Sequence, residues 1–82
     1  MSETPEARLK RMKIRSWRRG IKEMDLILGP YADANLTQMD QAALDLYDDL
    51  LEENDQDLYQ WVSGQVTPPE RFATLIASLV PR

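Results

Sequence analysis

Apolar side chains recur along this chain three or four residues apart, the spacing that places them on one face of a helix. The pattern is most regular after Asn35, where the apolar positions are Met39, Ala43, Leu46, Tyr47, Leu50 and Leu51. The residues that face away from them are acidic: Asp45, Asp48, Asp49, Glu52 and Glu53. Thr37 followed by Asp40 resembles a capping box at the start of this helix. No run of strand length alternates apolar and polar residues, so the pattern predicts an all-α fold.

Residues that favour helix ends divide the N-terminal part into two helices. Thr4 followed by Pro5 predicts an N-cap and a first helical position, and this helix is expected to end near Arg15 or Ser16. A second helix is expected to include Gly20 and to bury Ile21, Met24, Leu26, Ile27 and Leu28. The pair Gly29-Pro30 should end or kink it, because proline lacks an amide donor and clashes with the preceding turn.

Similar signals predict two further helices after the acidic one. Asn54 or Asp55 can cap a short fourth helix, and Gly64 suits its C-terminal end. The run Thr67-Pro68-Pro69-Glu70 has the cap, proline and glutamate expected at the start of a fifth helix. The apolar residues of these two helices are Leu58, Trp61, Val62, Phe72, Leu75, Ile76, Leu79 and Val80. We therefore expect a compact single-domain bundle of about five short helices over residues 1–82, with residues 1–7 frayed.

Length and composition exclude several classes of function. A chain of 82 residues can form one core but has too little material to enclose a deep substrate cavity. Histidine and cysteine are absent, which excludes disulfides, thiolate nucleophiles, imidazole catalysis and the usual zinc ligands. Neither a signal peptide nor an apolar run of roughly 20 residues that would span a membrane is visible. We expect a monomeric cytoplasmic protein that works through a binding surface.

Charge is strongly segregated, although the formal net charge is only -4. From Arg8 to Lys22 there are eight basic residues and no acidic one, and from Glu23 to Tyr59 there are eleven acidic residues and no basic one. The simplest interpretation is a solvated basic face that the acidic helices balance. The alternative is nucleic-acid binding, which would use Trp17 for stacking and, for phosphates, Arg15, Arg18, Arg19 and Lys22. The acidic face opposes that alternative because it would repel a long polyanion.

Clustered carboxylates are weaker candidates for chemistry. The acidic group Asp48, Asp49, Glu52 and Glu53 lacks the loop glycine and the spacing of a calcium site, so a solvated face is expected there. A small enzyme that uses paired carboxylates is the least favoured class, because no part of the sequence suggests a pocket that would tune their pKa values. We therefore predict no catalytic residue and no bound metal.

The candidate site is the boundary between the two charged segments, Arg18-Arg19-Gly20-Ile21-Lys22-Glu23. Arg19 and Glu23 are four residues apart, so on a helix their side chains would share a face. An ion pair in this order would contribute only a few tenths of a kcal/mol, which does not account for a glycine between them. Glycine is explained if another backbone approaches closely. We interpret the segment as an interface, with Arg19 and Glu23 flanking the contact at Gly20.

Three stretches of the chain resemble one known family. Arg19-Gly20-Ile21-Lys22-Glu23 matches the Arg-Gly-x-x-Glu motif of the SdhE family, the small helical assembly factors for the flavoprotein subunit of succinate dehydrogenase. The stretch Glu23-Met24-Asp25-Leu26-Ile27-Leu28 resembles the family's second helix. Its later signature is similar to Leu50-Leu51-Glu52 together with Asp55-Gln56-Asp57-Leu58-Tyr59-Gln60-Trp61. The resemblance covers Arg11 to Phe72, nearly the whole chain.

The resemblance implies a chaperone-like assembly factor rather than an enzyme. Such a factor binds the flavoprotein subunit of succinate dehydrogenase and promotes covalent attachment of FAD to a histidine of that partner. The flavin chemistry would be the partner's own, and FAD would be the partner's cofactor. This chain lacks a glycine-rich phosphate loop, so stable binding of FAD is not expected.

The implied partner-binding residues are Arg19, Gly20 and Glu23, and further candidates are their neighbours Arg18, Lys22 and Asp25. Family members also assist fumarate reductase flavoproteins, so the motif leaves the preferred partner open. The alternative function is that of a nucleic-acid-binding or antitoxin-like regulatory protein.

Overall fold

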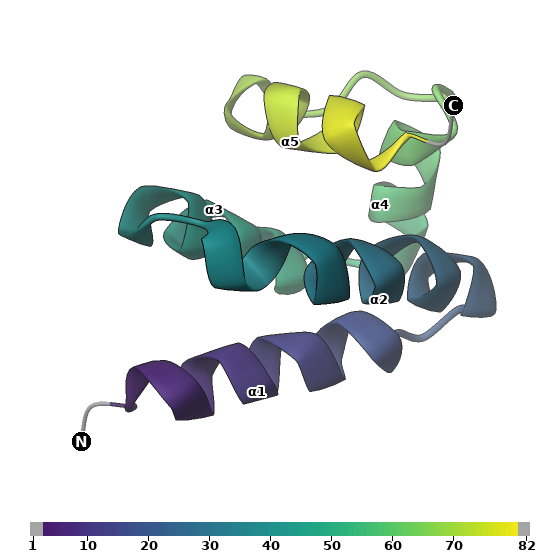
Figure 1. Cartoon of the computed structure of the whole chain (residues 1–82). Coiled ribbons are helices and arrows are strands. Elements are labelled where there is room, and N and C mark those ends of the chain that lie inside the picture. Colours follow the sequence, from purple (N-terminus) through teal and green to yellow (C-terminus); the bar gives the residue numbers. More distant parts are fainter. Residues whose placement is uncertain (1–2, 81–82) are drawn as a thin grey trace.

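A computed structural model describes residues 3–80, and these residues contain five α-helices, two 3₁₀ turns and no strand. Their order is α1 (Pro5–Trp17), α2 (Lys22–Asn35), η1 (Leu36–Gln38), α3 (Gln41–Leu51), α4 (Asp55–Val62), η2 (Glu70–Phe72) and α5 (Ala73–Leu79). In Figure 1, α1 runs along α2, α3 lies behind α2, and α4 leads the chain away to α5 on the side opposite α1. The predicted all-α bundle of about five short helices is confirmed.

The hydrophobic core receives side chains from all five helices and both 3₁₀ turns. Its buried members are Met12, Met24, Leu28, Ala32, Leu36, Tyr47, Leu50, Leu51, Leu58, Val62, Phe72, Leu75, Ile76 and Leu79. Burial of one large apolar side chain contributes about 1.5–3 kcal/mol, so this shared core holds the short helices together. Leu26 on α2 was expected to be buried, and Val80 was named among the apolar residues of the fifth helix, but both side chains are exposed.

One buried polar pair fixes how α1 crosses α3. Ser16 Oγ donates to the carbonyl of Met12 at 2.8 Å and lies 2.6 Å from Tyr47 Oη. Both residues are fully buried, and burial raises the pKa of Tyr47 to about 12. Because buried polar groups are costly unless they are paired, this contact specifies one alignment of the two helices.

The first helix begins as predicted. Thr4 Oγ1 accepts a hydrogen bond from the amide of Ala7 at 3.1 Å, and Pro5 occupies the first helical position. The helix continues to Trp17, slightly beyond its predicted end near Arg15 or Ser16. Of the segment predicted to fray, Met1 and Ser2 lie outside the described residues, while Pro5 to Ala7 form the first turn of α1.

One prediction for α2 is wrong, and of the two outcomes predicted for Gly29-Pro30, one, the end of the helix, is not observed. Gly20 lies in the loop before α2, whose N-cap is Ile21. Gly29 and Pro30 do not end the helix, which continues to Asn35. The residue before a proline is usually kept out of helices by a clash with its Cβ, which Gly29 lacks. Pro30 is exposed, so water can reach the Leu26 carbonyl that loses its helical partner.

The starts of α3 and α5 also differ from prediction. Thr37 lies in η1, and Asp40 caps α3 by accepting from the amide of Ala43 at 2.8 Å. The fifth helix does not begin at Thr67, because each of the successive prolines disfavours a helical conformation in the residue before it. The chain instead forms η2 and starts α5 at Ala73.

The fourth helix agrees with prediction at both ends. Asn54 Oδ1 accepts from the amide of Gln56 at 2.8 Å and caps α4. Gly64 follows α4 with a φ of 84°, a left-handed conformation that favours glycine. The position of α4 matters for the site, because its first residue contacts the loop between α1 and α2.

Candidate functional site

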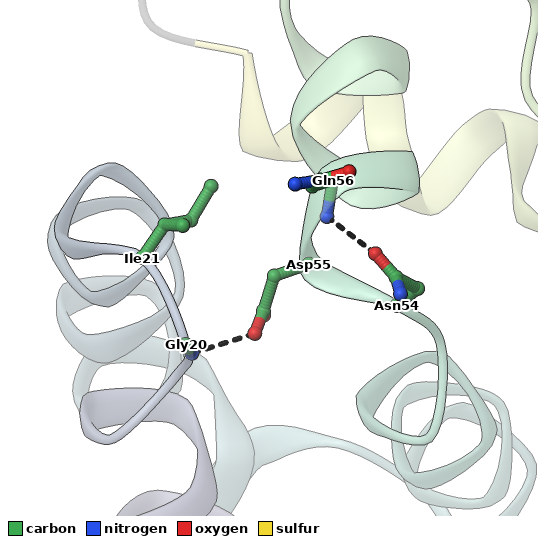
Figure 2. Close-up of a pocket in the computed structure, with 5 residues that line it drawn as sticks. All are labelled: Gly20, Ile21, Asn54, Asp55 and Gln56. Carbon is green, nitrogen blue, oxygen red and sulfur yellow. Dashed lines mark hydrogen bonds between the residues drawn. The ribbon is translucent and has the colours of Figure 1, made fainter.

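The candidate segment forms the loop between α1 and α2, and Asp55 at the start of α4 closes it. Arg19 Nε donates to Asp55 Oδ1 at 2.6 Å, and the amide of Gly20 donates to Asp55 Oδ2 at 2.6 Å. Figure 2 shows the second of these bonds. Asp25, in the first turn of α2, accepts a hydrogen bond from the amide of Arg19. Two carboxylates from different helices thus fix the backbone of this loop.

The guanidinium of Arg19 points into the molecule. Its Nη1 donates to the carbonyl of Leu51 at 2.7 Å, and its Nη2 donates to the carbonyl of Glu53 at 2.9 Å. Arg15 Nη2 also donates to the Leu51 carbonyl, at 3.0 Å. Only 3% of the Arg19 side chain is exposed. These arginines satisfy carbonyls at the C-terminus of α3, where cations are favourable.

The glycine at position 20 is required by a neighbour in the same chain. A Cβ at Gly20 would lie 2.6 Å from Asp55 Oδ2, closer than carbon and oxygen atoms can pack. Asp55 cannot move away easily, because Arg19 and the Gly20 amide both hold its carboxylate. The close approach inferred for Gly20 is therefore made by Asp55 of this chain, and it needs no partner to explain it.

Five of the six predicted site residues fall into two groups, and the sixth is Gly20, described above. Arg18, Lys22 and Glu23 are exposed, and within residues 3–80 none of them forms an ion pair. Arg19 and Asp25 instead bind other parts of the chain. The prediction that Arg19 and Glu23 share one helix face is wrong, because Arg19 precedes α2 and its side chain turns inward. A partner could thus contact Arg18, Lys22 and Glu23 directly, next to the exposed Gly20.

An open hollow of about 300 Å³ lies beside Gly20. Its lining residues are Gly20, Ile21, Asn54, Asp55 and Gln56. In Figure 2, Ile21 projects from the α2 side and Gln56 from the α4 side of this space. Asn54 and Gln56 were not predicted as site residues, because they reach the loop only through the packing of α4. A shallow hollow of this kind suits docking rather than enclosure of a substrate.

The basic residues offered for nucleic-acid binding are partly used within the fold. Arg15 and Arg19 donate to backbone carbonyls at the end of α3. Trp17 packs its ring against Gly29, where an added Cβ would lie 2.3 Å from the indole, and its Nε1 donates to Asp33 at 3.2 Å. One face of the indole is therefore unavailable for stacking on a base.

Two of the clustered acids form ion pairs. Asp48 accepts from Arg11 Nη2 at 2.8 Å, and Asp49 accepts from Arg71 Nη1 at 3.2 Å. The hydrogen bonds from Arg11 hold the pKa of Asp48 below its ordinary value. Across residues 3–80 there is no group of three or more histidine, cysteine or acidic side chains that could hold a metal ion. None of the described helices has both the length and the apolar character needed to cross a bilayer.

Curated proteins similar to this chain carry related names. The chain is 40% identical over 70 residues to succinate dehydrogenase assembly factor 2, mitochondrial, of Schizosaccharomyces pombe, covering 85% of this chain and 50% of the relative. It is 41% identical over 73 residues to the protein of the same name from Meyerozyma guilliermondii, covering 85% and 54%. It is 37% identical over 65 residues to the FAD assembly factor SdhE of Francisella tularensis, covering 79% and 68%. The chain spans about half the length of the two mitochondrial relatives.

A family model matches nearly the whole chain. The match runs over residues 10–81 and includes the entire loop, all of α2, and α1 from Lys10 onward. The model is described as Sdh5, flavinator of succinate dehydrogenase. This finding and the bacterial relative confirm the resemblance seen in the Arg19–Glu23 motif. The chain belongs to the Sdh5 family of succinate dehydrogenase flavinators, which includes SdhE.

Proposed function

We propose that this chain binds the flavoprotein subunit of succinate dehydrogenase and promotes covalent attachment of FAD to a histidine of that subunit. The observation that carries the proposal is the family match over residues 10–81, which contains the complete Arg-Gly-x-x-Glu segment. The composition agrees with a helper role, because a chain without histidine or cysteine lacks the usual flavin-linking side chains. Bond formation would then be autocatalytic in the partner.

The structure suggests how the loop acts. Asp55 and Asp25 hold the backbone at Arg19 and Gly20, so the loop is ordered before a partner arrives. An ordered loop loses little conformational freedom on binding. A partner held against it can keep its histidine and its flavin in reacting geometry, and correct orientation alone lowers a barrier substantially.

The roles of the motif residues can be divided accordingly. Glu23, Lys22 and Arg18 are exposed and would touch the partner next to the exposed Gly20, which lines the hollow. Arg19 and Asp25 would act through the loop, as positioning residues. We propose further that the free chain is a monomer, that it acts in the cytoplasm, and that a fumarate reductase flavoprotein is a second partner.

The test is the covalent flavin content of the succinate dehydrogenase flavoprotein. The flavoprotein is produced with this chain, with Glu23→Ala, with Glu6→Ala or alone, then denatured and examined by in-gel flavin fluorescence. Glu6 is the matched control, since both residues are exposed acids in the first turn of a helix. We expect strong signal with the wild type and Glu6→Ala, and about tenfold less with Glu23→Ala if it contributes as an interface hot spot.

Equal fluorescence in all four samples, with every chain shown to be expressed, would contradict the proposed function. A signal that rises equally with the wild type and both variants would keep the function and remove Glu23 from the site.

A further inference from the structure

A second hollow lies next to the first and is mainly apolar. Its volume is about 360 Å³, and its lining residues are Glu23, Leu26, Ile27, Tyr59, Val62 and Ser63. Leu26 is the most exposed of the large apolar residues in the described chain, at 59%, and Tyr59 is 37% exposed. Neither Leu26 nor Tyr59 belongs to the core, so packing within the fold does not account for these apolar side chains.

The two hollows follow one another between α2 and α4. On the α2 side, Ile21 lines the polar hollow, and Glu23, two residues further along the chain, lines the apolar one. On the other side, Gln56 and Tyr59 are three residues apart and therefore lie on one face of α4. We call the surface formed by these two hollows the α2–α4 seam. It is polar at Gly20 and apolar at Leu26, with Glu23 between the two ends.

The charge on the seam restricts what can occupy it. Glu23 stands at the rim of the apolar hollow and forms no ion pair within residues 3–80. A carboxylate beside apolar side chains is complementary to an apolar side chain that has a cation next to it. A second copy of this chain fits poorly, because a two-fold contact through the seam would bring two Glu23 carboxylates together. The phosphates of free FAD would be repelled for the same reason.

We propose that the apolar end of the α2–α4 seam anchors the flavoprotein partner. The partner inserts one large apolar side chain between Leu26 and Tyr59 and pairs a neighbouring arginine or lysine with Glu23. A standard interface buries about 800 Å² on each side, which is more than one hollow supplies, so this contact is an anchor within a wider surface. Anchors of this kind supply most of the binding energy of an interface. The inference rests on the proposed function and adds the residues and chemistry of docking.

The experiment compares variants at two exposed apolar positions. Leu26→Ser changes the seam, and Ile14→Ser is the matched control, because Ile14 is 46% exposed and lines a separate hollow on α1. Affinity for the purified flavoprotein is measured by titration calorimetry, and folding is checked by thermal melting. We expect Leu26→Ser to weaken binding about tenfold or more, as for an interface hot spot, while Ile14→Ser binds like the wild type. Tyr59→Ala, a second seam variant, should behave like Leu26→Ser.

Other outcomes separate the two proposals. If the wild type binds and Leu26→Ser and Tyr59→Ala bind equally well, the seam is not the anchor, while the proposed function stands. Equal weakening by Ile14→Ser would also overturn the inference, since the effect would not be specific to the seam. If light scattering shows that the wild type dimerises and Leu26→Ser does not, the occupant is a second copy. Failure of the wild type to bind the flavoprotein or to raise its flavin content would overturn both proposals.

Discussion

Arg19 and Asp55 are 36 residues apart in the chain, yet their side chains define the candidate site. The sequence alone could indicate this segment as the candidate site, because the Arg19–Glu23 motif is local. It could not predict that the Arg19 guanidinium is buried, since an arginine near a helix end can point outward or bind carbonyls with equal ease. The outcome depends on where α3 ends and α4 begins, and packing sets those positions.

Because the Arg19 side chain is bonded within the fold, its removal should lower the free energy of unfolding. In Arg19→Ala, Asp55 loses its ion pair, and the carbonyls of Leu51 and Glu53 lose donors. We expect a loss of about 2–3 kcal/mol in the free energy of unfolding, measured by urea denaturation. The control is Arg18→Ala, an exposed neighbour, which should change stability by less than about 0.5 kcal/mol. A stable Arg19→Ala variant would mean that the buried contacts are not needed by the fold.

Individual helices show which sequence signals are reliable. The caps at Thr4 and Asn54 and the left-handed Gly64 were predictable, because each depends on residues within one turn of the chain. The continuation of α2 through Pro30 was not, because Gly29-Pro30 locally indicates a helix end, and the Trp17 ring that packs on Gly29 comes from another helix. Its indole lies directly on the backbone at Gly29, so the glycine there permits helix packing rather than marking a helix end.

Substitution of Gly29 by alanine tests this explanation for α2. Alanine is favoured over glycine inside a helix by about 1 kcal/mol, so the change would stabilise an isolated helix. In the protein, the new Cβ would overlap the Trp17 ring, which lies only 2.3 Å from its ideal position. We expect Gly29→Ala to lower the melting temperature, with a net cost of about 1–3 kcal/mol from overpacking.

A double variant provides the control for that measurement. If the overlap causes the loss, Gly29→Ala should cost much less in a Trp17→Ala background than in the wild type. Equal costs in the two backgrounds would show that Trp17 is not the reason for the glycine.

Across the whole molecule, the segregated charges become contacts between α1 and α3. Arg8 pairs with Asp45 at 2.7 Å, and Arg11 pairs with Asp48 at 2.8 Å. These pairs give the basic segment of α1 a role in the fold. They agree with the interpretation that the acidic helices balance the charge of the basic face. The sequence could indicate the balance but not the partners, because the alignment of α1 on α3 is set by buried contacts such as Ser16 with Tyr47.

This arrangement predicts how stability changes in acid. The lowered pKa of Asp48 means that its ion pairs stabilise the protein above the ordinary aspartate pKa and are lost as the pH falls through the lowered value. Asp48→Asn should therefore be less stable at pH 7 by about 1 kcal/mol, allowing for partial solvent screening. Between about pH 4 and pH 2 it should lose less stability than the wild type.

Urea denaturation at a series of pH values measures this difference. Glu52→Gln is the control, because Glu52 is exposed and forms no ion pair in the described part of the chain. Parallel stability curves for Asp48→Asn and the wild type would show that the α1–α3 pairs do not contribute.

The shared carboxylate of Asp55 also bears on how the surface moves. Because one side chain closes the loop before α2 and begins α4, neither can open without breaking bonds to the other. Small independent fluctuations of the two walls of the seam are therefore suppressed, and opening becomes a single cooperative event. Loss of the Asp55 carboxylate would therefore loosen both walls of the seam at once rather than one of them.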